Sequence, residues 1–280
     1  MTMTTGTEQK YETVLVERDN GIAWVTLNRP EKRNAMNPTM HREMVEVLDE
    51  LEFDPEAKVL VLTGAGDSWC AGQDLREFFR ALDNSPRERA KAGRDSQQWR
   101  WKKLYTYPKP TIAMVNGFVF GGGFTPLVAC DFAIAAEEAT FGLSEINWGI
   151  FPGGLVAKVV ADALRYRDGL YYTMTGDPFD GKTAAEMGLV NKAVPRAQLR
   201  EETVALAEKL LSKNPNVLRA CKEVYKTVRW MNYDQAEEYM GAKSTALRAT
   251  DSERGREHGM SQFLDDKTYR PGFGEYKRPD

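Results

Sequence analysis

The chain has 280 residues, of which 42% are hydrophobic and 28% charged, and its formal net charge is −3. This balance is typical of a soluble globular protein with one large domain or two small ones. The slight negative charge argues against nucleic acid or an anionic membrane as the main partner, and no apolar run is long enough to cross a bilayer. Residues 1–10 are polar and lack the apolar stretch of a signal peptide, so we expect a flexible tail on a cytoplasmic protein.

The first half of the chain alternates strand and helix signals. Glu12–Glu17 and Ile22–Leu27 alternate polar and apolar residues around Asp19-Asn20-Gly21, which predicts a β-hairpin. Residues 59–64 form a continuous apolar run of buried-strand length. A helix is predicted after Pro38 from apolar residues at helical spacing, namely Met40, Met44, Val47, Leu48 and Leu51. A charged helical segment, residues 85–104, follows and ends before Pro108-Lys109-Pro110.

The same alternation continues to about residue 136 and then gives way to helix. Residues 111–115 and 132–135 read as strands, with a helix over 125–130 between them. Alternating strands and helices predict an α/β fold with parallel strands joined by right-handed crossovers. From Leu199 the pattern is wholly helical. We therefore expect a core over residues 1–198 and a helical region over 199–280.

Cysteine and histidine are scarce. The odd number and wide spacing of Cys70, Cys130 and Cys221 favour neither a disulfide framework nor a zinc site, and without a paired histidine Cys70 reads as a packed small residue. The two histidines, His41 and His258, are predicted to lie on the surface or on a helix face. A Ser-His-Asp triad and a metal site are both disfavoured, so proton transfer falls to carboxylates, tyrosine or lysine.

Two glycine-rich segments suggest the chemistry. Three consecutive glycines in Phe120–Thr125 let main-chain N–H groups face a ligand without a Cβ in the way. The segment Phe141–Glu145 places a single carboxylate, that of Glu145, among apolar and turn residues. An exposed N–H group beside a buried acid can stabilise an oxyanion while a proton moves.

A third loop follows the strand predicted at residues 59–64. Gly64 and Gly66 form only half of a dinucleotide-binding fingerprint, because the third glycine and the helix after it are missing. Gly72-Gln73 instead offers a second main-chain N–H at the end of a strand. Two such groups on one carbonyl oxygen would form an oxyanion hole.

Four motifs in this order, Asn28–Met36, Ala71–Leu75, Asn116–Gly123 and Phe141–Gly153, resemble the crotonase (enoyl-CoA hydratase/isomerase) superfamily over about residues 11–273. The resemblance implies a spiral of ββα units, a helical C-terminal trimerisation region and an acyl-CoA thioester substrate. It further implies a homotrimer or hexamer with no cofactor, since coenzyme A is part of the substrate.

The resemblance also implies site residues. The oxyanion hole is assigned to the N–H groups of Gln73 and Gly122, and proton transfer to Glu145. Simple hydratases carry a second glutamate where Thr125 stands, but one carboxylate can deprotonate water and return the proton to the α-carbon. Thr125 is read either as a helix N-cap or as a residue that orients water or substrate. Coenzyme A contacts are assigned to Lys32, Arg33, Ala35, Ala71, Asp74 and Leu75.

Within this family, residues 98–102, 126–131 and 141–150 look like those of the hydroxycinnamoyl-CoA (feruloyl-CoA) hydratase-lyases, which convert feruloyl-CoA to vanillin and acetyl-CoA. Relatives carry tyrosines where Phe78 and Gly241 stand, and Tyr239 lies two residues away, about 200° around a helix. Phe78, Trp148 and Tyr239 are therefore candidates for substrate binding, with packing as the alternative. Two other functions stay open, namely an enoyl-CoA hydratase or isomerase for another acyl group, and a non-catalytic CoA-binding protein.

Overall fold

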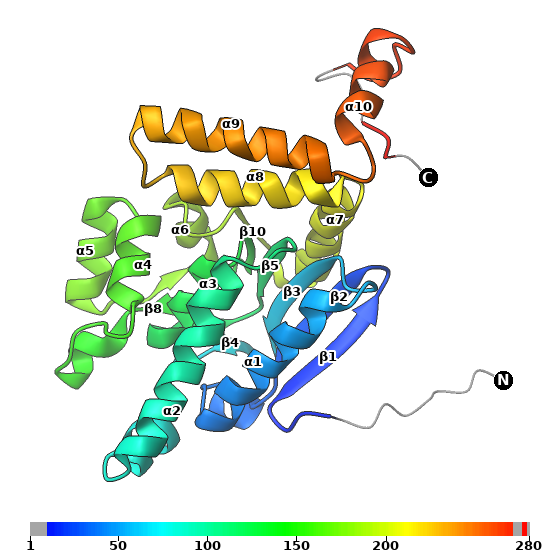
Figure 1. Ribbon diagram of the computed structural model, residues 1–280. Helices are drawn as coiled ribbons and strands as arrows, with labels where there is room; N and C mark the ends of the chain where they lie inside the picture. The colour runs from blue at the N-terminus through cyan, green and yellow to red at the C-terminus, as the bar shows by residue number, and fades with distance from the viewer. Residues whose placement is uncertain (1–9, 271–275, 279–280) are drawn as a thin grey trace. The chain divides into compact units, whose positions relative to one another are not determined.

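The computed structural model describes residues 10–270 and 276–278 (Figure 1). The chain divides into two compact units, the first ending at Thr203 and the second beginning at Val204, with Pro108–Pro110 grouped with the second. Among the described residues no helix is long and apolar enough to span a bilayer.

The first unit contains a six-stranded sheet that carries all five of the predicted strands. The predicted hairpin is confirmed: its strands pair antiparallel and its turn residues, Asn20 and Gly21, both have positive φ, at 50° and 82°. The other neighbours in this sheet pair in parallel, as predicted. In spatial order the strands are β1 (Val14–Asp19), β2 (Ile22–Leu27), β3 (Val59–Gly64), β5 (Thr111–Val115), β7 (Phe132–Ala136) and β10 (Lys192–Val194).

A second sheet is built from much shorter strands. Its order is β4 (Ser68–Cys70), β6 (Phe118–Phe120), β8 (Thr140–Gly142) and β9 (Phe179–Asp180), the first three being parallel neighbours. Each short parallel strand directly follows a long one, in the pairs β3–β4, β5–β6 and β7–β8, which gives the expected ββα repeat. Carboxyl ends of neighbouring parallel strands lie at one edge about 4.8 Å apart. The loops after β4, β6 and β8 are therefore brought side by side.

Helices complete the first unit. The predicted helix is α1 (Pro38–Phe53), which buries its whole predicted apolar stripe and is capped by the Asn37 side chain, 2.9 Å from Met40 N. The charged helix is α2 (Pro86–Gln97), which continues as the π-helical segment η4 (Gln98–Lys103). The remaining helices are α3 (Phe124–Ala129), α4 (Val156–Ala163), α5 (Tyr166–Thr175) and α6 (Gly181–Glu186). Helical turns lie at η1 (Pro30–Lys32), η2 (Leu75–Phe79), η3 (Arg80–Leu82), η5 (Gly121–Gly123), η6 (Ser144–Trp148) and η7 (Arg196–Gln198).

The pattern predicted to be helical from Leu199 onward corresponds to α7 (Leu199–Leu211), α8 (Pro215–Val228), α9 (Tyr233–Thr250) and α10 (Gly255–Leu264). In the second unit, α8 and α9 lie side by side (Figure 1) and are joined by an ion pair between Lys243 and Glu223, 2.6 Å apart. A capping box formed by Asn232 and Gln235 begins α9.

Candidate functional site

Glycines let the loops after β4, β6 and β8 approach one another closely. A Cβ on Gly122 would lie 3.3 Å from Gln73 N, and one on Gly72 would lie 3.0 Å from Gly122 N. A Cβ on Gly121, whose φ is 45°, would lie 2.9 Å from Glu145 Oε1. Three residues predicted from the sequence, Gln73, Gly122 and Glu145, thus meet at one edge of the short-stranded sheet.

The two main-chain N–H groups in this cluster have no partner from regular structure. Met36 N donates to Gly72 O (2.8 Å) and Asp74 N donates to Met36 O (2.9 Å), so the N–H of Gln73 between them faces away from this ladder. Gly122 lies in the first turn of η5, where N–H groups have no intrahelical acceptor. Two such adjacent N–H groups are the donors that an oxyanion hole requires.

Glu145 supplies a carboxylate with unused hydrogen-bonding capacity. It sits in the first turn of η6, and its Oε2 is buried with no hydrogen-bond partner among the described residues. Burial raises the pKa of Glu145 above its ordinary value. A carboxyl group in this state can take a proton from water and give it back.

The structure decides one of the two readings of Thr125. Gly123 is the N-cap of α3 and Phe124 its first residue, so Thr125 does not cap the helix and that reading is wrong. Thr125 is 1% exposed, and its Oγ1 has no hydrogen-bond partner in the described part of the chain. Its role in orienting water or substrate stays a prediction.

His41 is not at the surface, contrary to one of the predictions made for it. It lies fully buried on the face of α1 that packs against η4, whereas His258 on α10 stays partly exposed. Burial and the charge of Arg100 lower the pKa of His41 to about 3, so the ring is neutral. This imidazole is therefore unsuited to be the general base.

Both ring nitrogens of His41 are engaged. Trp99 Nε1 donates to Nδ1 (2.8 Å), because an indole nitrogen can only donate. The proton is thereby placed on Nε2, which donates to Gln73 Oε1 at 2.7 Å, and Gln73 Nε2 donates to Ser96 Oγ at 3.0 Å. The hydrogen-bond series Trp99–His41–Gln73–Ser96 fixes the Gln73 side chain without using its main-chain N–H.

The residues predicted to contact coenzyme A come from two segments that hydrogen bonds join. Ala71 N donates to Arg33 O at 2.9 Å, and Arg29 Nη1 contacts both Ala35 O (2.6 Å) and Asp74 Oδ2 (2.9 Å). The side chains of Lys32, Arg33 and Leu75 are exposed next to these segments. The arrangement leaves cationic side chains available for a phosphate-bearing ligand.

The Asp74 carboxylate is largely committed to the fold. Besides its ion pair with Arg29, it caps η2 by accepting from Arg76 N and Glu77 N at 3.0 and 2.9 Å. Burial acts to raise the pKa of Asp74, but the hydrogen bonds from Glu77 N–H and Arg29 outweigh it and lower the pKa.

The aromatic candidates fall in different places. Phe78 is half-buried and packs edge-on against the His41 ring, with 5.2 Å between centroids. Trp148 is 66% exposed at the end of η6, three residues after Glu145. Tyr239 and Gly241 lie on α9 in the second unit, where Lys243 Nζ is 5.8 Å from the Tyr239 ring. Their substrate contacts stay predictions.

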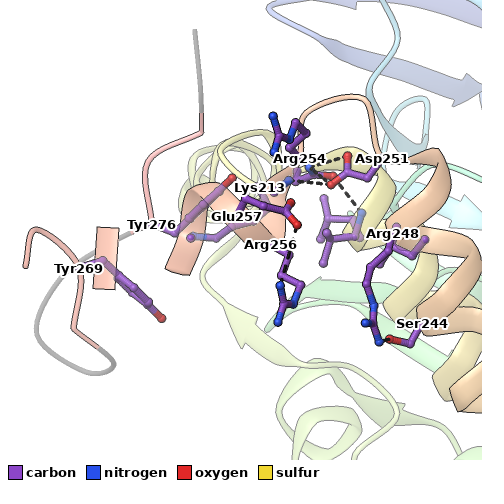
Figure 2. A pocket seen from close by; sticks show the side chains of 15 residues that line it. Lys213, Ser244, Arg248, Asp251, Arg254, Arg256, Glu257, Tyr269 and Tyr276 are labelled. Atoms are coloured by element: carbon purple, nitrogen blue, oxygen red, sulfur yellow. Dashed lines mark hydrogen bonds and ion pairs between the residues drawn. The ribbon is translucent and has the colours of Figure 1, made fainter. Parts of the chain in front are cut away.

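A separate cavity of about 750 Å³ lies within the second unit, among α8, α9, α10, Tyr269 and Tyr276 (Figure 2). Asp251 is one of the residues that line it, and its carboxylate accepts hydrogen bonds from the side chains of Asn214 and Asn216 and from Gly255 N. None of the predicted site residues lines this cavity. Across the described residues, no group of three or more His, Cys, Asp or Glu side chains is arranged to hold a metal ion.

Sequence reasoning missed Arg100. This residue is buried on η4 and donates through Nη1 to Gly122 O and through Nε to Ser96 O, both at 3.2 Å. The available signal was an arginine between two tryptophans, Trp99 and Trp101, inside an otherwise charged helix.

Known proteins are similar to this chain over most of its length. The chain is 60% identical over 272 residues to the hydroxycinnamoyl-CoA hydratase-lyase of Pseudomonas fluorescens, covering 97% of this chain and 99% of that protein. It is 31% identical to the crotonyl-CoA hydratase of Syntrophomonas wolfei, covering 91% and 96% of the two chains. The crystal structure of an enoyl-CoA hydratase from Mycobacterium smegmatis superposes with a TM-score of 0.84 at 25% identity, covering 96% and 98%. Residues 17–273 match the enoyl-CoA hydratase/isomerase family, and the chain belongs to this family.

Proposed function

We propose that this protein adds water to a 4-hydroxycinnamoyl-CoA thioester, such as feruloyl-CoA, and cleaves the product to an aromatic aldehyde and acetyl-CoA. The observation that carries the proposal is the meeting of two main-chain N–H groups, on Gln73 and Gly122, with Glu145, whose buried Oε2 has no hydrogen-bond partner among the described residues. Near-full-length similarity to a hydratase-lyase supports the substrate class.

In the hydration step, Glu145 removes a proton from water while the water oxygen bonds to the β-carbon. The electrons of the double bond move to the thioester, whose oxygen becomes an enolate between Gln73 N–H and Gly122 N–H. One such donor contributes about 3–4 kcal/mol to the transition state. Glu145 then returns its proton to the α-carbon, giving the β-hydroxyacyl thioester.

In the cleavage step, the β-hydroxyl group gives its proton to the Glu145 carboxylate. The Cα–Cβ bond breaks, its electron pair forms the enolate of acetyl-CoA in the same oxyanion hole, and the β-carbon leaves as the aldehyde. Protonation of that enolate at the α-carbon by Glu145 yields acetyl-CoA. Substrate and one water thus balance aldehyde and acetyl-CoA, so no cofactor is needed beyond the coenzyme A of the substrate.

Binding and assembly form the finer part of the proposal. Lys32, Arg33, Ala35, Ala71, Asp74 and Leu75 contact coenzyme A, and Phe78, Trp148 and Tyr239 contact the aryl group. The protein acts in the cytoplasm as a homotrimer or hexamer. Exposed apolar side chains that follow one another closely support an oligomer, because monomeric proteins rarely expose a contiguous apolar patch; within ten residues the exposed ones are Ile146, Trp148, Ile150, Phe151 and Leu155. Light scattering tests the assembly, and a monomer in solution would contradict the trimer or hexamer.

The function is tested by incubating the protein with feruloyl-CoA. We expect the absorbance of the conjugated thioester to fall and equal amounts of vanillin and acetyl-CoA to appear. Hydrated thioester without aldehyde would remove the cleavage step, and faster turnover of crotonyl-CoA would make the protein a hydratase for aliphatic chains. Because Phe78 and Gly241 stand where relatives have tyrosines, caffeoyl and coumaroyl thioesters belong in the same panel.

A further inference from the structure

The π-helical segment η4 turns two consecutive side chains, Trp99 and Arg100, into the interior. A π-bulge is a rare helix distortion that occurs frequently at functional sites. Arg100 is 5% exposed, and the hydrogen bonds that it donates go to two main-chain carbonyl oxygens, those of Ser96 and Gly122. Its charge therefore lies beside the glycine loop that carries one of the two unpaired N–H groups.

This guanidinium has no counter-anion in the described part of the chain. Two titratable side chains interact with it electrostatically, and both are neutral. Burial raises the pKa of the Cys70 thiol to about 11, and burial together with Arg100 lowers the pKa of His41 to about 3. Burial also lowers the pKa of Arg100, but only to about 10, so the guanidinium is charged at neutral pH.

A buried charge without a partner is costly, and a neutral donor could also hydrogen-bond the Gly122 carbonyl. The position of the Arg100 guanidinium suggests a use for its charge. A Cβ on Gly122 would lie 3.4 Å from Arg100 Nη1 and 3.3 Å from Gln73 N. The cation therefore adjoins the pair of amides where a negative oxygen would form.

We propose that Arg100 is the counter-charge for the thioester enolate, acting as a positioning and electrostatic residue behind Gly122 without touching the substrate. The inference rests on the proposed function. As water adds, negative charge leaves Glu145 and appears on the thioester oxygen. Arg100 donates to Gly122 O, whereas Glu145 lies against Gly121, so the guanidinium favours the charge that forms over the charge that is lost.

Two substitutions separate charge from hydrogen bonding. Arg100→Gln keeps a neutral N–H donor near Gly122 O, whereas Arg100→Lys keeps the positive charge. We expect Arg100→Gln to lower kcat for feruloyl-CoA about 10- to 100-fold with little change in KM, and Arg100→Lys to recover most of the loss. Equal losses in both variants, or full activity in Arg100→Gln, would overturn the proposal.

A spectroscopic measurement tests the same charge without turnover. In a Glu145→Gln background, bound feruloyl-CoA should absorb at longer wavelength than free feruloyl-CoA, because the oxyanion hole polarises its carbonyl. Adding Arg100→Gln should reduce that shift, and adding Arg100→Lys should restore it. Equilibrium dialysis verifies that the thioester is bound in each variant, and Arg100→Met replaces Arg100→Gln if the latter does not fold.

The outcomes of this experiment are distinct. An unchanged shift after Arg100→Gln would overturn the role of Arg100 and leave the proposed function standing. No shift in the Glu145→Gln protein with thioester bound would remove the oxyanion hole itself, and with it both the proposed function and this inference.

Discussion

Two acidic residues, Asp74 and Glu145, lie just past the ends of β4 and β8 and have opposite surroundings. The Asp74 carboxylate is paired with Arg29 and receives two main-chain N–H groups, and its pKa is lowered. Glu145 has a buried oxygen with no hydrogen-bond partner in the described part of the chain, and its pKa is raised. Hydrogen bonds to the ionised form lower a carboxyl pKa, whereas burial without them raises it. The satisfied acid stabilises the fold, and the unsatisfied one is available for chemistry.

The largest effect on activity is expected from Glu145→Gln. Loss of the general acid and base should reduce kcat/KM for feruloyl-CoA by about 10³- to 10⁴-fold. The free energy of unfolding should stay equal or rise at neutral pH, because a buried ionised group with a raised pKa destabilises the folded state. Steady-state kinetics and denaturant unfolding measure the two quantities. A large loss of stability would place Glu145 with Asp74 as a structural acid.

The pH profile checks the same assignment. The reaction needs ionised Glu145, so the acid limb of kcat/KM should have its midpoint above 4.5, the ordinary value for this group. A limb at or below that pH would mean that another group controls activity.

Gly122→Val tests the second partner of the chemistry. The new side chain meets Gln73 and Arg100, and we expect kcat/KM to fall about 10²- to 10³-fold while the fold largely survives. Gly93→Ala on α2 is the matched control, because its Cβ meets nothing within 4 Å. That variant should keep its activity and gain slight stability from better helix propensity. Undiminished turnover in Gly122→Val would remove this residue from the site.

Asp74→Asn should have the opposite effect from Glu145→Gln, with a loss of stability in place of an unchanged or higher one. Breaking the buried ion pair with Arg29 should lower the free energy of unfolding by about 1.5–3 kcal/mol, because Arg29 keeps its second ion pair, with Glu77. Because the folded-state pKa of Asp74 is depressed, its contribution is complete above the ordinary pKa of 3.8 and is lost as pH falls through the folded-state value. Denaturant unfolding at pH 7 and at pH 3 should show a difference between wild type and variant that shrinks with acid.

The smallest effect is expected from Thr125→Val. Removing a buried hydroxyl that has no hydrogen-bond partner among the described residues should leave the free energy of unfolding unchanged or raise it by up to about 1 kcal/mol. If the hydroxyl orients water or substrate, kcat/KM falls about 10-fold, and Thr125→Ser restores it. Equal activity in the wild type, Thr125→Val and Thr125→Ser would leave Thr125 without a catalytic role.

The long strands and α1 could be predicted from the sequence because their apolar periodicity extends over five or more residues. The strands β4, β6 and β8 have three residues each, too few for a period to be visible. Their positions were accessible only through the motifs around Gly72, Gly122 and Glu145. Those motifs carried the resemblance, and they also lie where the short strands end.

The remaining differences have local causes. His41 reads as an ordinary polar residue on an amphipathic helix, and its burial depends on Trp99, which lies 58 positions later and provides a hydrogen bond. Arg100 lies in a segment rich in charge, and the π-turn that moves it inward has no known sequence signature. The Thr125 reading depended on where α3 begins, which the sequence leaves uncertain by a few residues.

The short-stranded sheet also fixes the position of Glu145 relative to the oxyanion-binding loops. With the thioester oxygen held between the loops after β4 and β6, the carboxylate beyond β8 lies beside the same glycine loop, where a Cβ on Gly121 would meet Glu145 Oε1 at 2.9 Å. This closeness suits a reacting carbon near the thioester carbonyl. A double bond conjugated with the thioester would then be favoured by how the short strands place the two loops, independently of contacts to the aryl ring.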